Sequence, residues 1–307
     1  MIYPFGVRRD IGLQALSLKL AAVASVLNAF ALLRIGAVDA AALSTLCAVA
    51  GSMGWALLRG RPLPLRFGPA LVGLGLLDGL GAICLFASLE RLGPVPVALL
   101  GGMSPAFAAP LAFVALGERP SREEVLLGLA AVVGALLFSW QGTAPVSGAG
   151  VALACASTLA YTAGNLLAKV ALRHSSPSAV LGSSRLVSLS LVVGYGLVAG
   201  GLCSSHPGMT GVALVAVAAL AGNFASVLLY YRVLRSASLS LTTVVRVAGP
   251  VATAAFAWPF FPMSLTSLNL AGGAVLVGSV TWLGVGPGIR RGLARRGRPA
   301  PASAPSA

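Results

Sequence analysis

Residues 85–137 read LFASLERLGPVPVALLGGMSPAFAAPLAFVALGERPSREEVLLGLAAVVGALL, and this stretch decides the fold of the chain. It contains two long apolar runs, placed here at 95–116 and 122–140, with a short charged segment between them. A membrane-spanning helix needs about 20 mostly apolar residues, because the hydrocarbon core is about 30 Å thick and offers no water to unpaired backbone groups. The stretch therefore predicts two transmembrane helices joined by a tight charged loop.

The same pattern extends in both directions along the chain. Of the 307 residues, 57% are hydrophobic and 9% are charged, which lies outside the usage of soluble domains. Proline, glycine and charged residues divide the sequence into ten apolar runs: 14–34, 38–58, 68–89, 95–116, 122–140, 149–171, 178–200, 210–232, 240–261 and 265–285. The sequence therefore predicts an all-α membrane protein with ten transmembrane helices and no extramembrane domain.

The distribution of arginine predicts the orientation. If the N-terminus is cytoplasmic, the outer loops contain only Arg34 and Arg91, and the inner segments contain the other loop arginines: Arg8, Arg9, Arg59, Arg61, Arg66, Arg119, Arg122, Arg173, Arg232, Arg235 and five in the tail. Positive side chains concentrate on the cytoplasmic side of membrane proteins. Both termini are therefore predicted to be cytoplasmic. The use of 19 arginines against 2 lysines is typical of a GC-rich bacterial genome, which predicts the plasma (inner) membrane.

The two halves of the chain are predicted to be repeats. Moving residues 68–141 forward by 145 positions aligns Pro105 with Pro250 and Asp78 with Asn223. A unit of five helices is odd in number, so its second copy enters the membrane from the opposite side, as in many secondary transporters. We therefore expect two inverted five-helix repeats, 1–142 and 143–286, around a central cavity, followed by a basic, disordered tail, 287–307.

The net charge of +14 does not by itself indicate a nucleic-acid partner, because the basic residues are scattered at the ends of apolar runs. The tail cluster is interpreted as an anchor to anionic lipid. The four cysteines all fall in apolar runs, with no CxxC spacing and no neighbouring histidine or carboxylate, and are interpreted as packing residues. No metal site, cofactor or nucleic-acid partner is predicted.

The quoted stretch resembles the repeat of the EamA-like branch of the drug/metabolite transporter superfamily. The resemblance rests on the proline in the fourth run, the Gly117-Glu118 pair at its end and the glycine-spaced fifth run. The second half keeps the proline as Pro250 but has Pro262 and Met263 in place of the Gly-Glu pair. The fragment LAYTAGNLLAKVAL at 159–172 and Arg185 are also similar to the family's second half.

This resemblance implies a ten-helix bundle around a central cavity, acting as an exporter or exchanger of small metabolites. Amino acids, their analogues and drug-like compounds are the cargo classes that it implies. Membrane lipid is the other expected partner, and the oligomeric state, monomer or homodimer, is left open. The alternative from another class is a membrane-embedded enzyme acting on lipid or isoprenoid head groups, which needs clustered carboxylates or histidines. The only acidic cluster, Glu118, Glu123 and Glu124, lies beside arginines at a helix start, so the chain is predicted not to be an enzyme.

Asp78 is the sharpest candidate for a functional residue. It lies about ten residues into the third run, too deep and too short to reach the interface. A charged group at that depth is costly, so it needs a partner or a water-filled cavity. Asp78 is therefore either a cavity carboxylate that binds cargo or exchanges a proton, since desolvation favours the neutral form, or a hydrogen-bonded link between two helices.

Three further polar residues are candidates for cargo binding, each with a structural alternative. Asn223 aligns with Asp78 in the repeat, and buried asparagine also links transmembrane helices. Arg246 lies four residues before Pro250, so it either faces the cavity, pairing with Asp78 or a cargo carboxylate, or caps the carbonyl that the proline frees. Arg185 lies two turns into the seventh run, and either lines the cavity or extends to the interface.

A polar face is predicted on the sixth run, where Tyr161 and Asn165 stand four residues apart and therefore share one side of a helix. Together with Asn28 they form a candidate cavity wall, and packing inside an apolar bundle is the alternative. Pro105 and Pro250 are predicted to kink the fourth and ninth helices, about which the two halves move in alternating access.

Overall fold

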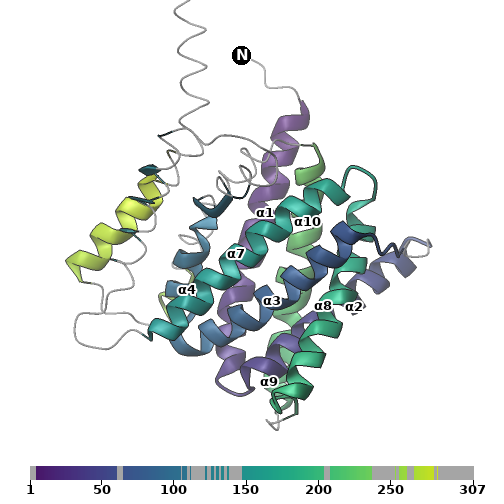
Figure 1. The fold of residues 1–307 in the computed structure, drawn as a ribbon, viewed down its shortest axis with the longest axis horizontal. Helices are drawn as coiled ribbons and strands as arrows, with labels where there is room; N and C mark the ends of the chain where they lie inside the picture. The colour runs from purple at the N-terminus through teal and green to yellow at the C-terminus, as the bar shows by residue number, and fades with distance from the viewer. Residues whose placement is uncertain are drawn as a thin grey trace, which may run out of the picture.

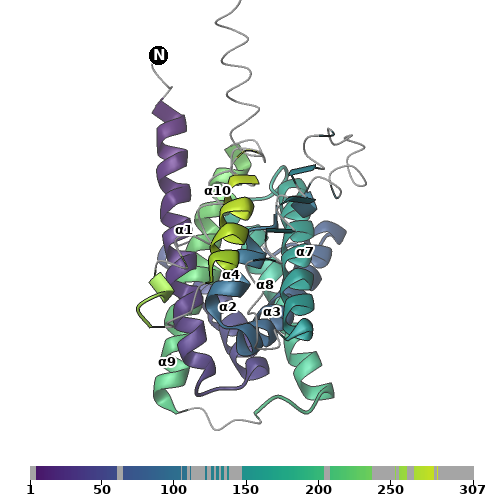
Figure 2. The same cartoon turned by 90° about the vertical axis from the view of Figure 1, so that its left-hand side faces the viewer.

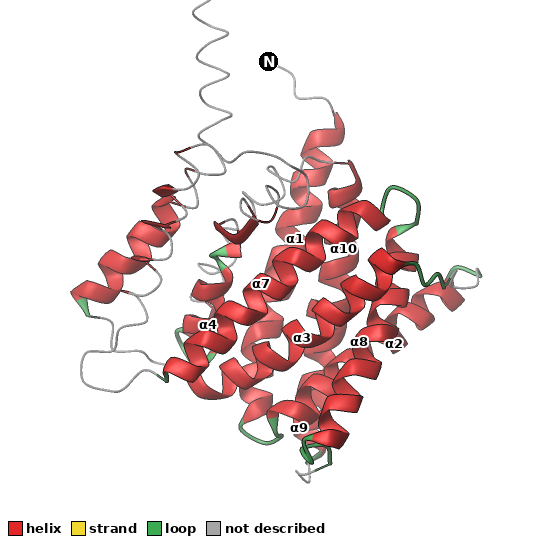
Figure 3. Cartoon of the chain, in the orientation of Figure 1, coloured by secondary structure: helices red, strands yellow, loops and turns green. Residues whose placement is uncertain are grey.

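The computed structural model describes residues 5–60, 65–104, 106–108, 111, 122, 126–127, 129–130, 133–134, 137, 147–203, 208–236, 253, 256–260, 266–279 and 282. Within these residues the chain forms helices and short connections and contains no strand (Figure 3). Six helices are long and apolar enough to cross a membrane. The predicted all-α, multi-pass class is therefore confirmed.

The first half begins with four labelled helices, α1 (Phe5–Leu32), α2 (Ala37–Leu58), α3 (Pro69–Leu92) and α4 (Pro94–Gly101). Proline stands in the first turn of α3 and of α4, where its missing N–H costs no helical hydrogen bond. Gly93 separates these two helices with φ of 76°, a left-handed conformation that glycine adopts without strain. The sharp turn between α3 and α4 therefore follows from the Gly-Pro sequence.

The second half contains α7 (Gly148–Ala171), α8 (Pro177–Val198), and a continuous helix made of α9 (Met209–Ala218), the π-helical segment η1 (Ala219–Ser226) and α10 (Val227–Ser236). Ser147 and Ser176 cap α7 and α8, because their hydroxyls accept hydrogen bonds from the N–H groups of Gly150 and Ala179. A further apolar helix, Ser267–Ser279, lies at the edge of the molecule (Figure 1).

The observed helices match six of the ten predicted spans: 14–34, 38–58, 68–89, 149–171, 178–200 and 210–232. The fourth span, 95–116, begins as α4, and the helix Ser267–Ser279 lies inside the tenth, 265–285. Most of the fifth span, 122–140, and of the ninth, 240–261, lies outside the described residues. The count of ten and the inverted repeat therefore remain predictions.

The helices run side by side along one direction and pack across the boundary between the two halves (Figures 1 and 2). Helix α3 packs against α7 and α8, and the α9–η1–α10 helix packs against α1 and α2. Helix α2 also contacts α8. Each half therefore buries its third helix between the first two helices of the other half.

Glycines set the close approach of α3 and α8. A Cβ atom on Gly75 would lie 2.5 Å from Val187 Cβ and 2.7 Å from the Ser184 carbonyl oxygen. One turn later, a Cβ atom on Gly79 would lie 3.1 Å from the Ser188 carbonyl oxygen. Small residues at this spacing let two helix backbones touch, which brings the side chains between them into register.

One prediction about the cysteines is wrong. Cys203 is exposed in the connection between α8 and α9, with φ of 58°, and its N–H donates to Asp39 Oδ1 at 2.7 Å. The apolar residues that precede it are the end of α8, and Cys203 itself lies beyond that helix. Its side chain is therefore not part of the core.

Candidate functional site

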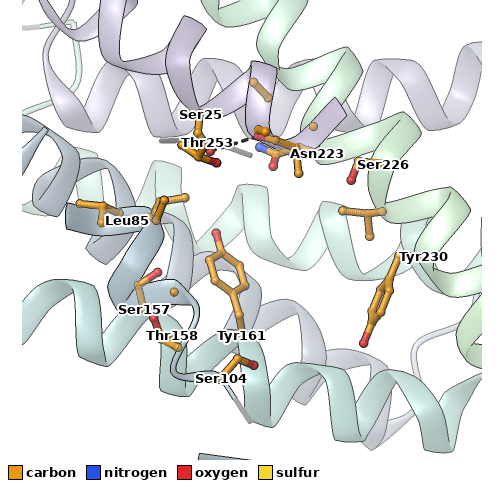
Figure 4. Close-up of a pocket in the computed structure, with 18 of the residues that line it drawn as sticks. Ser25, Leu85, Ser104, Ser157, Thr158, Tyr161, Asn223, Ser226, Tyr230 and Thr253 are labelled. Carbon is orange, nitrogen blue, oxygen red and sulfur yellow. Dashed lines mark hydrogen bonds between the residues drawn. The ribbon is translucent and has the colours of Figure 1, made fainter. Parts of the chain in front are cut away.

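A cavity of about 320 Å³ lies between the two halves. Its described lining comes from α1, α3, α4, α7, α8, η1 and α10, with Gly102, Ser104, Ala108 and Thr253 beyond them. The polar residues of this lining are Ser25, Asn28, Asp78, Ser104, Ser157, Thr158, Tyr161, Thr162, Asn165, Arg185, Asn223, Ser226, Tyr230, Tyr231 and Thr253. Several of them are seen around the open space in Figure 4. The remaining lining is apolar, so the cavity has the mixed wall typical of small-molecule sites.

The charged part of this wall is an ion pair between α3 and α8. Arg185 Nη1 lies 3.5 Å from Asp78 Oδ2, and both residues are about 5% exposed. Within the described structure, Asp78 Oδ2 and Arg185 Nε have no hydrogen-bond partner. The alternative that Arg185 extends to the membrane interface is therefore wrong. Asp78 links α3 to α8 and lines the cavity, and its role in binding cargo or exchanging a proton stays a prediction.

Helix α7 supplies a continuous polar face to the cavity. The residues Ser157, Thr158, Tyr161, Thr162 and Asn165 line it, and their spacing of about four residues places them on one side of the helix. Ser157 Oγ donates to the Gly81 carbonyl of α3 at 2.9 Å, and Thr162 Oγ1 lies 2.8 Å from Ser104 Oγ. The Tyr161 ring packs beside Gly81, and its hydroxyl points into the open space (Figure 4).

The opposite wall is formed by η1, in which Asn223 and Ser226 line the cavity. Asn223 Nδ2 donates to Ser44 Oγ of α2 at 2.6 Å. Ser226 and Ser17 of α1 exchange hydrogen bonds, each hydroxyl donating to the other residue's carbonyl oxygen at 2.8 Å. A π-helix is rare and often marks a functional position, and here it carries three residues of the cavity wall, Gly222, Asn223 and Ser226.

The contacts of the two walls match under the 145-residue shift. Asp78 of α3 reaches α8, and Asn223, at 78 + 145, reaches α2. The Gly81 carbonyl accepts from Ser157 of α7, and the Ser226 carbonyl, at 81 + 145, accepts from Ser17 of α1. Equivalent positions in the two third helices therefore contact equivalent helices of the opposite half.

The structure brings six predicted residues together in one cavity: Asn28, Asp78, Tyr161, Asn165, Arg185 and Asn223. Arg246, Pro105 and Pro250 lie outside the described residues. Sequence reasoning missed the hydroxyl groups of the wall, among them Ser25, Ser104 and Ser226, and it missed Ser44 behind Asn223. Part of the wall could have been predicted from the sequence. Ser157, Thr158 and Thr162 recur at the helical period of Tyr161 and Asn165, which places all five on one side of the helix.

Comparison with known families identifies the first half of the chain. Residues 11–140 match the model of the EamA-like transporter family. This segment of the chain is EamA-like. This family belongs to the drug/metabolite transporter superfamily, so the resemblance found in the sequence is confirmed, and it implies a multi-pass membrane transporter of this type.

The fold is shared with solved structures. A crystal structure of a protein that is 16% identical in sequence superposes with a TM-score of 0.62, covering 88% of this chain and 98% of the other. At this identity the likeness shows the fold alone. No curated protein matches the sequence.

Proposed function

We propose that this EamA-like protein is a secondary carrier, an exporter or exchanger of small metabolites that works by alternating access in the plasma membrane. The observation that carries the proposal is the cavity between the two halves, lined by polar groups from six labelled helices, α1, α3, α7, α8, η1 and α10. Amino acids, their analogues or compact drug-like compounds are the proposed cargo. The cavity volume of about 320 Å³ suits a solute of that size.

The matched contacts support an inverted repeat as the basis of the mechanism. Because Asp78 and Asn223, and Gly81 and Ser226, make corresponding contacts with opposite halves, the two halves can exchange conformations around one central site. Such an exchange would open the cavity first to one side of the membrane and then to the other. Pro105 and Pro250 remain the proposed kinks for this motion.

Asp78 is the proposed proton site if transport is coupled to a proton gradient. It is buried, it lines the cavity, and its Oδ2 atom is free of hydrogen bonds in the described structure. A carboxyl group in this position can take a proton when cargo leaves and release it when Arg185 pairs with it. The membrane-enzyme alternative gains no support, since Asp78 is the single acidic residue of the described lining.

Side-specific labelling of a cavity cysteine tests the proposal without knowledge of the cargo. The four native cysteines, Cys47, Cys84, Cys155 and Cys203, are replaced, and Ser25→Cys is introduced in the cavity wall. A membrane-impermeant methanethiosulfonate is then applied to intact cells and to inverted vesicles. A carrier exposes its central cavity to each side in turn, so the single cysteine is modified in both preparations.

Ala29→Cys is the matched control, because Ala29 lies one turn further along α1 and is buried outside the cavity lining. Modification of Ser25→Cys from one side only would contradict alternating access. Equal modification of Ala29→Cys would show that the reagent reports a loosened bundle and not a cavity.

A further inference from the structure

The charge of the cavity wall defines the class of cargo more narrowly than the family does. Asp78 and Arg185 are the charged residues of the described lining, and they face each other at 3.5 Å. Their charges are opposite and equal, so this part of the wall is neutral as a whole. This narrower class of cargo rests on the proposed carrier function of the same cavity.

The other polar groups of the described wall are neutral. The position that aligns with Asp78 under the 145-residue shift is occupied by Asn223, a neutral amide that donates to the neutral Ser44 hydroxyl. Hydroxyl and amide groups make up the rest of the polar lining. Such groups donate and accept hydrogen bonds without favouring either sign of charge.

The ion pair itself retains two unused hydrogen-bonding atoms. Asp78 Oδ2 is a buried acceptor and Arg185 Nε–H is a buried donor, and neither has a hydrogen-bond partner within the described structure. Unsatisfied buried groups are costly, so a ligand that satisfies both at once is stabilised. A molecule that does so presents a donor to the carboxylate and an acceptor to the guanidinium.

We infer that the cavity selects small solutes of zero net charge that carry a hydrogen-bond donor and an acceptor close together, with zwitterions the best match. A zwitterion places its cation at Asp78 and its anion at Arg185 and leaves the site neutral. A singly charged solute would pair with one member and leave the other buried without compensation, which is strongly unfavourable. The ion pair thus acts as a charge filter for cargo.

Three probes of similar size test this filter. L-Serine is a zwitterion, ethanolamine is the same molecule without its carboxylate, and 3-hydroxypropanoate is the same molecule without its ammonium group. Uptake of each labelled probe is measured in proteoliposomes of the full chain against protein-free liposomes. The wild type is expected to move L-serine roughly tenfold or more faster than either charged probe, because an uncompensated buried charge is penalised heavily.

Charge variants of the pair give the decisive comparison. Arg185→Gln leaves Asp78 alone and is expected to raise the ratio of ethanolamine to L-serine uptake, whereas Asp78→Asn is expected to raise the ratio for 3-hydroxypropanoate. The double variant Asp78→Asn/Arg185→Gln restores a neutral wall and is expected to exclude both charged probes again. It also controls for folding, since a residue that only holds helices together would reduce all three fluxes equally.

Three results would overturn the inference. Comparable wild-type uptake of ethanolamine or 3-hydroxypropanoate would show that the pair does not filter charge, and an anion preference abolished by Arg246→Gln would place the deciding charge elsewhere. Absence of flux for all three probes in protein that passes the Ser25→Cys labelling test would also refute it, while leaving the carrier function intact.

Discussion

The contact between α3 and α8 gives the sharpest prediction about stability. Gly75→Ala places a Cβ atom 2.5 Å from Val187 Cβ and 2.7 Å from the Ser184 carbonyl oxygen. Carbon atoms attract at about 3.5 Å or more, so the shortfall is about 1 Å. The Ser184 oxygen belongs to the helix backbone and cannot rotate away. The two helices must therefore separate along the line that carries the Asp78–Arg185 pair.

The magnitude follows from overpacking, which costs about 1–3 kcal/mol in a well-packed interior. Alanine also gains about 0.5–1 kcal/mol over glycine inside a helix, and this gain must be removed from the comparison. Gly194→Ala provides the matched control, because Gly194 lies on α8 and an added Cβ meets nothing within 4 Å. The difference between the two variants is therefore the cost of the clash alone.

Apparent melting temperature in detergent, followed by intrinsic fluorescence, measures this difference. At about 2–4 °C per kcal/mol, Gly75→Ala should melt about 2–12 °C below Gly194→Ala. The variant should also lose selectivity among charged probes, since the ion pair lies one turn further along α3. Equal melting temperatures would refute the conclusion that glycine sets the approach of α3 and α8.

Three further predictions concern the other walls of the cavity. Gly222→Ala should destabilise the protein, because the added Cβ atom would lie 2.5 Å from Ala24 Cβ. Adding Ala24→Gly to the same chain should restore the melting temperature. A melting temperature that stays low in the double variant would contradict a direct clash. Ser17→Ala and Ser226→Ala should each lower stability by roughly 1–3 kcal/mol, because each removes the hydroxyl that donates to the partner's carbonyl oxygen. The two hydroxyls also lie 3.0 Å apart, so the double variant should cost less than the sum, and strict additivity in thermal melts would argue against coupling. Asp78→Asn should make transport in proteoliposomes independent of an imposed pH gradient, and a gradient dependence equal to that of the wild type would remove Asp78 as the proton site.

The sequence alone predicts the membrane class and the six described spans. A long apolar run in a bilayer must pair its own backbone N–H and C=O groups, and a helix does so within one segment. The sequence also predicts that Asp78 needs a partner or a water-filled cavity, since a charged group at that depth is costly. It does not identify that partner. Arg246 is the arginine predicted to pair with Asp78, whereas the structure pairs Asp78 with Arg185. This pairing depends on the approach of α3 to α8, which is a property of packing between distant segments.

The hydroxyl residues of the wall illustrate a second limit. Thr158 Oγ1 and Thr162 Oγ1 donate to carbonyl oxygens four residues earlier, as serine and threonine commonly do in apolar helices. Because the hydroxyls of such residues can donate to carbonyl oxygens of their own helix, their presence in a transmembrane run does not reveal whether they face a cavity. The π-helical segment that directs Asn223 and Ser226 has no sequence signature either, and only the structure reveals it.

The central claim, that cargo passes through the cavity between the two halves, is tested most directly by blocking that cavity during transport. Purified Ser25→Cys protein, with the native cysteines replaced, is reconstituted in proteoliposomes and assayed for counterflow of a labelled metabolite panel before and after modification by a bulky thiol reagent. If cargo passes through the cavity, the protein shows specific counterflow and modification of Ser25→Cys abolishes it. Counterflow by the Ala29→Cys control is unaffected by the reagent. Counterflow that continues unchanged after complete modification of Ser25→Cys would show that cargo does not pass through this cavity.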